Sequence, residues 1–399
     1  MWSIKKNMLF GKQIKKFDYL KLLYYYFKVF GLATMTFVTD STKTTPNRFG
    51  TFSRSKYTIV YNVVIILVFV MPCLYNMTIF CVGTNRVKFE DFADCIQINM
   101  ALFVTIFILS KFCISSDSLI SIANSISRIT ESLLTLSSIS LQKRIKVSFE
   151  IKQAFIVNIT MWIAFIVINL SEIEPWMKNA VNMYVSNFLV SVLILQYSVI
   201  LKFLQYDFKI LNENLIEFRN EDSMKIRSPT ETKAKIDGLL KLQKLHESLS
   251  DTSRRVSMFY SYLMLVSVLN IFIMLIFVCY YLAKPIILTH DSNFSSIMLL
   301  RCFWYGLLFV VLLVTLTKFV TATIEESRRT KEIISSCLMI PDADEKLLNK
   351  LNQFSLYLLH RDVKFTVWGL FTLDESLLTS MAGSITTYMV IVLQFQQKD

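Results

Sequence analysis

The sequence predicts an all-α membrane protein that crosses the bilayer seven times and keeps its N-terminus in the cytoplasm. Three observations lead to this fold class. Apolar residues make up 54% of the chain and charged residues only 18%, whereas a soluble domain has about 25% charged residues. Only 8 Gly and 6 Pro occur in 399 residues, so little interrupts helix formation. The apolar residues are gathered in long runs, and most Lys and Arg residues lie between these runs.

Seven apolar stretches could cross a bilayer, since a transmembrane helix needs about 20 mostly apolar residues. They are 57–80, 95–114, 154–170, 180–201, 259–283, 302–324 and 376–395, of which the third is the shortest. The aromatic run 17–32 is interrupted by Lys21 and Lys28, so we interpret it as an interfacial helix and not as a span. No internal repeat or low-complexity linker divides the chain, which favours a single transmembrane domain.

The orientation follows from the 42 Lys and Arg residues, because cytoplasmic loops carry an excess of both. Thirty-six of them fall on the side of the N-terminus and 6 on the opposite side. The N-terminus is therefore expected inside and the short C-terminal tail outside. Asn293 begins an Asn-Phe-Ser glycosylation sequon in a predicted outer loop, which agrees with this orientation. The net charge of +12 belongs to the loops of a membrane protein, so we expect no nucleic-acid partner.

The predicted cytoplasmic side is also expected to be helical. Residues 205–256 are charged but keep regularly spaced leucines, so the neighbouring spans should continue as helices beyond the bilayer. Residues 342–360 resemble a separate amphipathic helix that starts at Pro341 and Asp342. Its apolar face consists of Leu347, Leu351, Phe354 and Leu358. This helix fits two interpretations equally well, a helix on the membrane surface or a contact between subunits.

The sequence gives no support to an enzyme. It contains no phosphate-binding glycine loop, no HExxH and no GxSxG, and its seven cysteines have no metal-ligand spacing. His246 and His360 are expected to be packed or solvated, because no matching ligand lies near either in the sequence. None of the seven spans contains Asp or Glu, which argues against a proton-coupled transporter or an intramembrane protease. We therefore expect no catalytic residue, no metal and no cofactor. Cys81 and Cys95 flank one outer loop and could pair.

A G-protein-coupled receptor is excluded as well. Such a receptor would need an extracellular N-terminus, and the charge count predicts a cytoplasmic one. No DRY-like triplet follows the third span, and no NPxxY lies in the seventh.

The last span is the most polar of the seven and suits a channel. Ser380, Thr387 and Gln394 recur every seven residues and therefore lie on one helix face. A stripe of small polar residues that ends in an amide could line a water-filled pathway. The alternative is that the hydroxyls bond back to their own helix or to a neighbouring one.

Two segments near the C-terminus resemble the insect gustatory receptors. One reads Gly-Leu-Phe-Thr-Leu-Asp over 369–374, and the other runs from Thr387-Tyr388 through five apolar residues to Gln394-Phe395. The second matches the signature that this family carries at the end of its seventh span. The resemblance in sequence covers about 50 residues, and upstream it is one of layout only.

This resemblance implies a plasma-membrane, ligand-gated and non-selective cation channel. It would be a homotetramer, or a heterotetramer with other gustatory receptors, that conducts monovalent and divalent cations. Gln394 and Phe395 would form the gate, with Ile391, Thr387 and Ser380 along the pore. The chain would then divide into a cytoplasmic segment (1–56), a six-helix ligand-binding bundle (57–324), a cytoplasmic anchor (325–374) and the pore helix with its tail (375–399). An odorant-receptor-type channel and a non-conducting adhesion or scaffold protein are the alternatives.

The resemblance also implies a small-molecule tastant, a sugar or a bitter compound. Its pocket would need aromatic surfaces and a few fixed polar groups. The outer halves of the predicted spans offer Gln97, Asn99, Tyr184, Tyr280, Trp304 and Tyr305. The alternative is that the aromatic residues face lipid headgroups, as Trp and Tyr near span ends often do.

Overall fold

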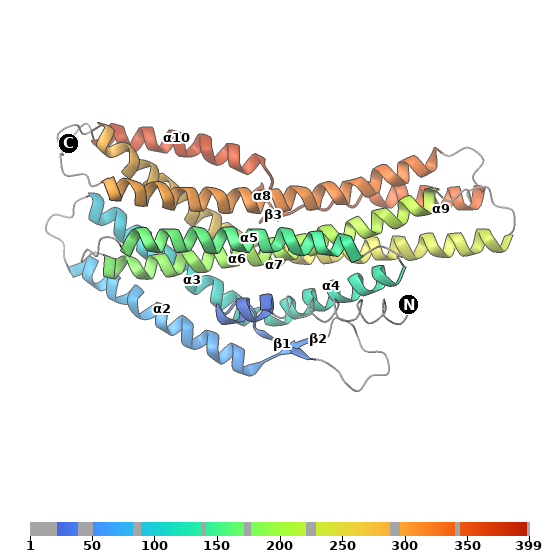
Figure 1. Cartoon of the computed structure of the whole chain (residues 1–399), viewed down its shortest axis with the longest axis horizontal. Helices are drawn as coiled ribbons and strands as arrows, with labels where there is room; N and C mark the ends of the chain where they lie inside the picture. The colour runs from blue at the N-terminus through green and yellow to red at the C-terminus, as the bar shows by residue number, and fades with distance from the viewer. Residues whose placement is uncertain are drawn as a thin grey trace, which may run out of the picture. The chain divides into compact units, whose positions relative to one another are not determined.

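The computed structural model describes residues 22–38, 51–82, 89–136, 141–170, 177–220, 229–287, 296–339 and 344–396. These residues are almost entirely helical (Figure 1). The helices are α2 (Lys56–Val82), α3 (Phe89–Ile114), α4 (Ser116–Leu136), α5 (Leu141–Leu170), α6 (Met177–Asn220), α7 (Pro229–Ile287), α8 (Ser296–Leu338), α9 (Glu345–Leu359) and α10 (Ser376–Gln396). Two short two-stranded sheets accompany them, formed by β1 (Met35–Val38) with β2 (Thr51–Arg54) and by β3 (Thr366–Val367) with β4 (Phe371–Thr372).

All seven predicted spans are confirmed as helices. In the part of the chain that the structure describes, five helices are long and apolar enough to cross a bilayer, namely those that hold the second to sixth predicted spans. The other two, α2 and α10, contain shorter apolar helical stretches over Lys56–Met71 and Ser376–Ile391 within the described residues.

The chain forms two compact units, and the first consists of Met1–Val38, Phe52–Ile120 and Lys178–Gln196. In it α2 packs against α3. Residues 22–29 are helical, and the backbone that follows them is held by side chains of this unit. The amide of Asn62 donates to the Gly31 carbonyl at 2.6 Å, and that of Gln196 donates to the Leu32 carbonyl at 2.8 Å. The described part of the predicted interfacial helix is therefore packed onto protein.

The second unit consists of Thr39–Thr51, Ser121–Met177 and Tyr197–Asp399. Its α7 has 59 residues, which span roughly 90 Å at 1.5 Å per residue, about three times the thickness of a bilayer core. The α6 helix likewise runs on to Asn220. The prediction that spans four and five continue as helices is thus confirmed for 205–220 and 229–256, the parts of that range that the structure describes.

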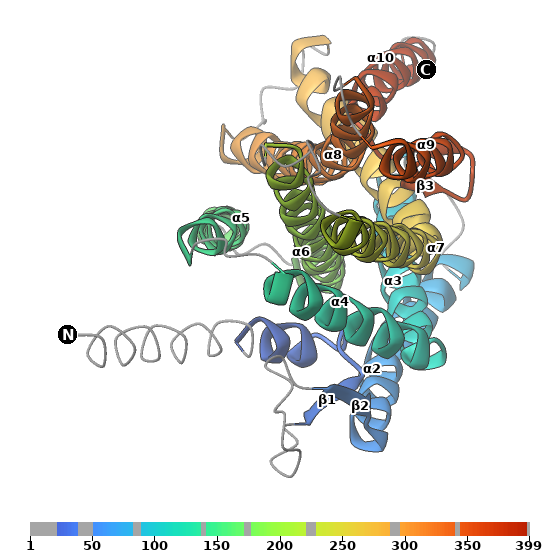
Figure 2. The same cartoon turned by 90° about the vertical axis from the view of Figure 1, so that its right-hand side faces the viewer.

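Helix α9 confirms the predicted amphipathic helix but corrects its start. The side chain of Asp344 accepts a hydrogen bond from the Lys346 amide, so Asp344 is the N-cap and not Asp342. The four predicted apolar residues are all buried. They face α7 and α8 of the same unit, which Figure 2 shows beside α9. The membrane-surface interpretation is therefore wrong, because protein already covers the apolar face.

Three features are not predicted from the sequence: the two small sheets and α4. Helix α4 buries Ile122, Ile129 and Leu133 among many serines. In the β3–β4 hairpin the turn residues Trp368 and Gly369 have φ of 49° and 73°. A positive φ is easy for glycine and costly for tryptophan. The Ser261 hydroxyl accepts a hydrogen bond from the Trp368 amide at 2.6 Å and helps to hold this turn in place.

Candidate pore helix and ligand pocket

Helix α10 begins directly after the β3–β4 hairpin. Asp374 caps it, since its carboxylate accepts hydrogen bonds from the Ser376 amide at 3.1 Å and from the Ser376 hydroxyl at 2.5 Å. These bonds lower the pKa of Asp374 below its ordinary value. Leu377 and Met381 are buried, and the ring of Tyr388 meets Phe272 of α7 edge-on at 6.0 Å. One side of α10 is therefore fixed against α7.

The predicted polar stripe lies on the exposed side of α10. Ser380, Thr387 and Gln394 are all exposed, and so is Ile391. The hydroxyls of Ser380 and Thr387 donate to carbonyls one turn earlier in the same helix, at 3.0 and 3.1 Å. The interpretation that these hydroxyls bond back to their own helix is thus confirmed for both residues, and the pore interpretation stays a prediction. The hydroxyl protons are satisfied within the helix, while the oxygen atoms still face outward and can accept hydrogen bonds from water. The side chain of Phe395 lies outside the described residues.

The six predicted ligand-binding residues fall into both units. Gln97, Asn99 and Tyr184 belong to the first unit, where Gln97 is buried and the Asn99 amide donates to the Cys95 carbonyl of its own helix at 2.9 Å. Tyr280, Trp304 and Tyr305 belong to the second unit. Three of the six predicted ligand-binding residues therefore belong to each unit.

In the second unit Trp304 and Tyr305 pack against α5. The indole N–H of Trp304 donates to the Met161 carbonyl at 3.0 Å, and the Tyr305 ring stacks on Phe165 at a centroid distance of 4.9 Å. Tyr280 and Tyr305 are 1% and 6% exposed. The alternative that the aromatic residues face lipid headgroups does not fit these two tyrosines, because their side chains are buried in the protein.

Two buried polar residues near these aromatic residues are absent from the set of ligand-binding residues predicted from the sequence. Arg301, which directly precedes the predicted sixth span, lies inside α8 and is 6% exposed. Asn169, near the end of α5, is also 6% exposed. The spacing of four residues between Arg301 and Tyr305, and again between Phe165 and Asn169, could have identified both.

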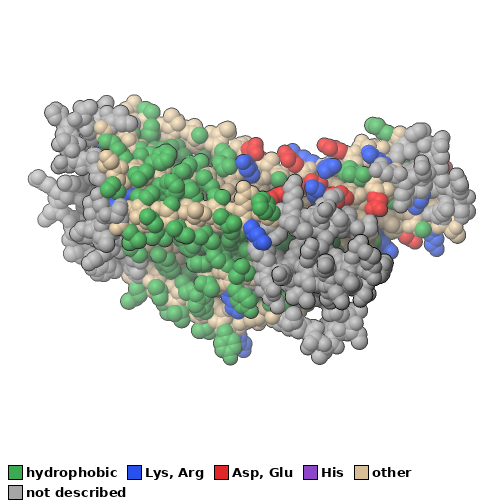
Figure 3. All heavy atoms as spheres, in the orientation of Figure 1, with side chains coloured by type: hydrophobic (Ala, Val, Ile, Leu, Met, Phe, Trp, Pro, Cys, Tyr) green, Lys and Arg blue, Asp and Glu red, His purple; other side chains and the backbone are tan. Residues whose placement is uncertain are grey.

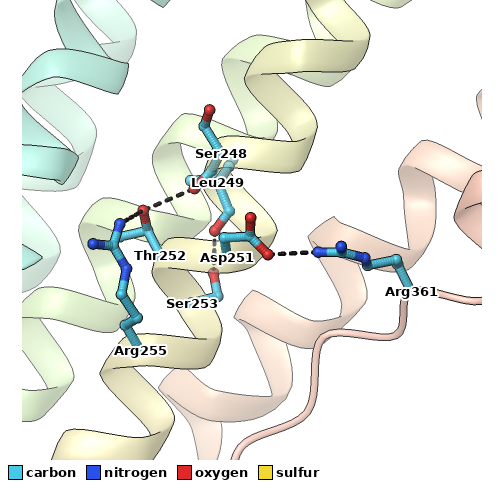
Figure 4. A network of polar contacts seen from close by, with 7 residues as sticks. All are labelled: Ser248, Leu249, Asp251, Thr252, Ser253, Arg255 and Arg361. Atoms are coloured by element: carbon cyan, nitrogen blue, oxygen red, sulfur yellow. Dashed lines mark hydrogen bonds and ion pairs between the residues drawn. The ribbon is translucent and has the colours of Figure 1, made fainter.

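Ion pairs join the segment that follows α9 to α7 and α8, and Figure 4 shows the one to α7. Arg361 pairs with Asp251 at 2.5 Å, and one turn along α7 Arg255 donates to the Thr252 hydroxyl at 3.1 Å. Lys331 of α8 pairs with Asp362. No group of three or more metal-ligating side chains occurs in the part of the chain that the structure describes. The predicted sequon at Asn293 and the side chain of Cys81 lie outside that part.

Curated relatives match parts of this chain. Putative gustatory receptor 28b of Drosophila melanogaster is 26% identical over 154 residues, which are 38% of this chain and 33% of that protein. The gustatory receptor for sugar taste 43a of the same fly is 30% identical over 172 residues, 42% of this chain and 39% of that protein. The chain thus matches less than two fifths of the length of either relative. The family model of the 7tm chemosensory receptors, in contrast, matches residues 20–399.

The chain belongs to the insect gustatory receptor family. A solved structure extends this to the fold. The insect olfactory receptor OR5 of Machilis hrabei, determined alone and in complex with eugenol, superposes with a TM-score of 0.67 at 15% identity. The superposition covers 96% of this chain and 99% of that one. This gustatory receptor is therefore a multi-pass membrane protein of the insect chemoreceptor fold, and the resemblance inferred from its C-terminal motif is confirmed.

Proposed function

We propose that this gustatory receptor is a tastant-gated, non-selective cation channel of the plasma membrane. Four chains would surround a pore lined by α10, with the N-terminus of each in the cytoplasm. The observation that carries the proposal is the exposed polar stripe of α10. A membrane helix that turns serine, threonine and glutamine side chains away from its own chain is costly in lipid and suited to a water-filled pathway.

The gate is assigned to Gln394 and Phe395. In a four-fold channel each position meets its three copies at the axis, so four amides would form a ring. An amide both donates and accepts, so these side chains could bond to one another when closed and to water when open. Phe395, about 100° round the helix, would add an apolar constriction. Opening would follow from a tastant that binds the open state more tightly than the closed one.

The tastant is expected to be a sugar or a bitter compound that binds in the outer half of the bundle. A relative that is named as a receptor for sugar taste supports a small polar ligand. An odorant-receptor-type channel would carry the same fold. A non-conducting adhesion or scaffold protein would differ from both, because no compound would evoke a current through it.

Recording from cells that express this chain, alone and with other gustatory receptors, tests the proposal. A panel of sugars and bitter compounds should evoke a cation current. Gln394→Ala should then change the basal current or its rectification at unchanged surface expression. Gln353→Ala removes the same exposed amide from α9 and should leave the current unchanged. Wild-type currents from Gln394→Ala channels would refute the gate, and silence of the wild type under every condition would refute the channel.

A further inference from the structure

Arg255 of α7 joins that helix to α4 through hydroxyl groups alone. Its guanidinium lies 3.2 Å from the Ser121 oxygen and 3.0 Å from the Ser125 oxygen, which are one turn apart on α4. A further hydrogen bond, of 3.1 Å, goes to the Thr252 hydroxyl of α7 itself. Within the part of the chain that the structure describes, these neutral groups are the partners of Arg255, and it forms no ion pair.

The carboxylates closest to this cluster in the sequence are engaged by other arginines. Asp251, one turn before Arg255, pairs with Arg361 at 2.5 Å, and Figure 4 shows Arg255 directed to the other side of α7. Asp117, near the start of α4, pairs with Arg54 at 3.4 Å. The positive charge of Arg255 is therefore not balanced by either carboxylate. A guanidinium that binds only neutral oxygens retains a strong attraction for an anion, because charge-assisted hydrogen bonds are about twice as strong as neutral ones.

The cluster offers hydrogen-bond donors and is open to solvent. A guanidinium has more N–H groups than the hydrogen bonds of Arg255 use. Ser121 and Ser125 accept from Arg255, and neither hydroxyl donates to another described residue, so both protons remain available. Ser121 is exposed and Arg255 is half-buried, so an anion can reach both side chains from solvent. N–H and O–H donors around one positive charge suit an anion with several oxygens, such as a phosphate group.

The cluster also lies at the edge of the apolar part of α7. Met258 and Tyr262 follow Arg255 at successive spacings of three and four residues, so the three side chains share one helix face. Met258 and Tyr262 are 56% and 41% exposed, and the Tyr262 ring centroid lies 5.5 Å from that of Trp368, which is 63% exposed. Exposed Trp and Tyr beside apolar side chains are typical of the boundary between bilayer and water. The phosphate groups of lipids lie at the same boundary, so a lipid headgroup is within reach of this cluster.

We infer that Arg255, Ser121 and Ser125 form a binding site for the phosphate group of an anionic phospholipid. The phosphate oxygens can accept from the unused N–H groups of Arg255 and from the two serine hydroxyls. A phosphomonoester, as in phosphatidic acid or a phosphorylated inositol headgroup, suits the site better than a phosphodiester, because it presents more terminal oxygens and a larger charge. The bound phosphate holds α4 against α7. This inference goes beyond the proposed function and does not depend on channel activity.

Lipid binding is measured on the purified full-length receptor in a non-ionic detergent, by its thermal stability during titration with dioctanoyl lipids. Phosphatidic acid should raise the melting temperature saturably. Phosphatidylglycerol, an anionic phosphodiester, should bind about 10-fold more weakly, and phosphatidylcholine, whose headgroup has no net charge, should give no shift. Inorganic phosphate distinguishes a soluble ligand from a lipid and should bind far more weakly than phosphatidic acid. The absence of a shift with phosphatidic acid, an equal response to all three lipids, or equal affinity for inorganic phosphate would each overturn the inference.

Substitutions of the two neighbouring arginines separate a specific site from attraction by charge alone. Arg255→Gln should weaken binding of phosphatidic acid about 10- to 100-fold, because it removes the charge and the planar donor group together. Arg254→Gln removes the same charge from the adjacent, exposed residue and should leave the affinity nearly unchanged. If Arg255→Gln does not fold, Arg255→Lys retains the charge without the planar fork and should still weaken binding. Equal weakening by the Arg254 and Arg255 variants would overturn the site.

The serine hydroxyls are tested with the charge intact. Ser121→Ala combined with Ser125→Ala should weaken binding of phosphatidic acid about 10-fold. Ser118→Ala combined with Ser127→Ala also removes two hydroxyls from α4, to which Arg255 forms no hydrogen bond, and should leave the affinity unchanged. Unchanged binding in the Ser121 and Ser125 double variant would overturn the assignment of the site to the contact between α4 and α7.

Discussion

His246 is a buried histidine in a cage of aromatic rings. It is 1% exposed and lies among Phe208 of α6 and Phe354 and Tyr357 of α9, with ring centroids 5.8–6.2 Å away. Neither ring nitrogen has a hydrogen-bond partner among the described residues. The sequence predicts a packed or solvated histidine here, and the structure shows a packed one. Its aromatic neighbours come from distant parts of the chain, so no local pattern could reveal them.

Acid should therefore loosen the packing of α6 and α9 around His246 of α7. Burial, with Lys331 and Arg361 nearby, lowers the pKa of His246 to about 4, from 6.5. The unfolded chain binds this proton more readily, so the stability is fully present above about pH 6.5 and is lost as the pH falls through 4. The shift corresponds to ~3 kcal/mol. Glu247 and Asp251 of α7 and Asp362 also lie in this region, and the Lys331 hydrogen bond lowers the pKa of Asp362.

Melting of the purified receptor between pH 7 and pH 4 measures this effect. His246→Phe should flatten most of the decline, whereas His360→Phe, at an exposed position, should leave it unchanged. Asp362 should still destabilise both variants at the acid end, because its lowered pKa stabilises the fold only while it is ionised. An undiminished acid response in His246→Phe would contradict the assignment.

At the scale of elements, α7 and α8 approach each other closely at one glycine. A Cβ atom on Gly306 of α8 would lie 2.8 Å from Cγ1 of Val278 of α7, closer than real Cβ contacts allow. Valine is stiff at χ1, so its methyl group cannot easily move away. Small residues at such contacts are usual where membrane helices pack tightly.

Gly306→Ala should accordingly lower the stability by about 1–3 kcal/mol, seen as a lower melting temperature. Val278→Ala removes the methyl group that clashes and should restore most of the loss in the double variant. Gly238→Ala, in α7, meets nothing within 4 Å and should stabilise the helix by up to about 1 kcal/mol. Additive effects of Gly306→Ala and Val278→Ala would show that the two residues do not touch in solution.

The sequence predicts the elements that carry a strong pattern. The seven spans follow from long apolar runs, and α9 follows from its apolar residues three or four apart. Helix α4 is not predicted, because many serines lie among its apolar residues. Ile122, Ile129 and Leu133 nevertheless have the spacing of one helix face. The β3–β4 hairpin has two residues per strand, too few for any period. The sixth span is predicted to begin at 302 because the charge of Arg301 interrupts the apolar run, whereas helix α8 includes Arg301 and buries it.

At the scale of the whole molecule, exposed apolar and charged side chains lie on different parts of the chain. On the face of the second unit in Figure 3, hydrophobic side chains cover α5 and the neighbouring part of α8, and charged ones gather toward α9. Helix α5 exposes isoleucines at 156, 159, 163 and 166, while its opposite face is buried. Such a large exposed apolar surface fits contact with lipid.

The division of charge between the two sides of the bilayer leads to the topology prediction. Of the 42 Lys and Arg residues, 36 lie on the side of the N-terminus, which the positive-inside rule assigns to the cytoplasm. An epitope tag before Met1 should therefore bind antibody only after cells are permeabilised, and a tag after Asp399 should bind on intact cells. Tags inserted between α6 and α7 and between α7 and α8 provide internal controls, since α7 crosses between them. The first should stain like the N-terminal tag and the second like the C-terminal one. The opposite pattern would place α10 with its gate residues toward the cytoplasm and would refute both the orientation and the outer ligand site.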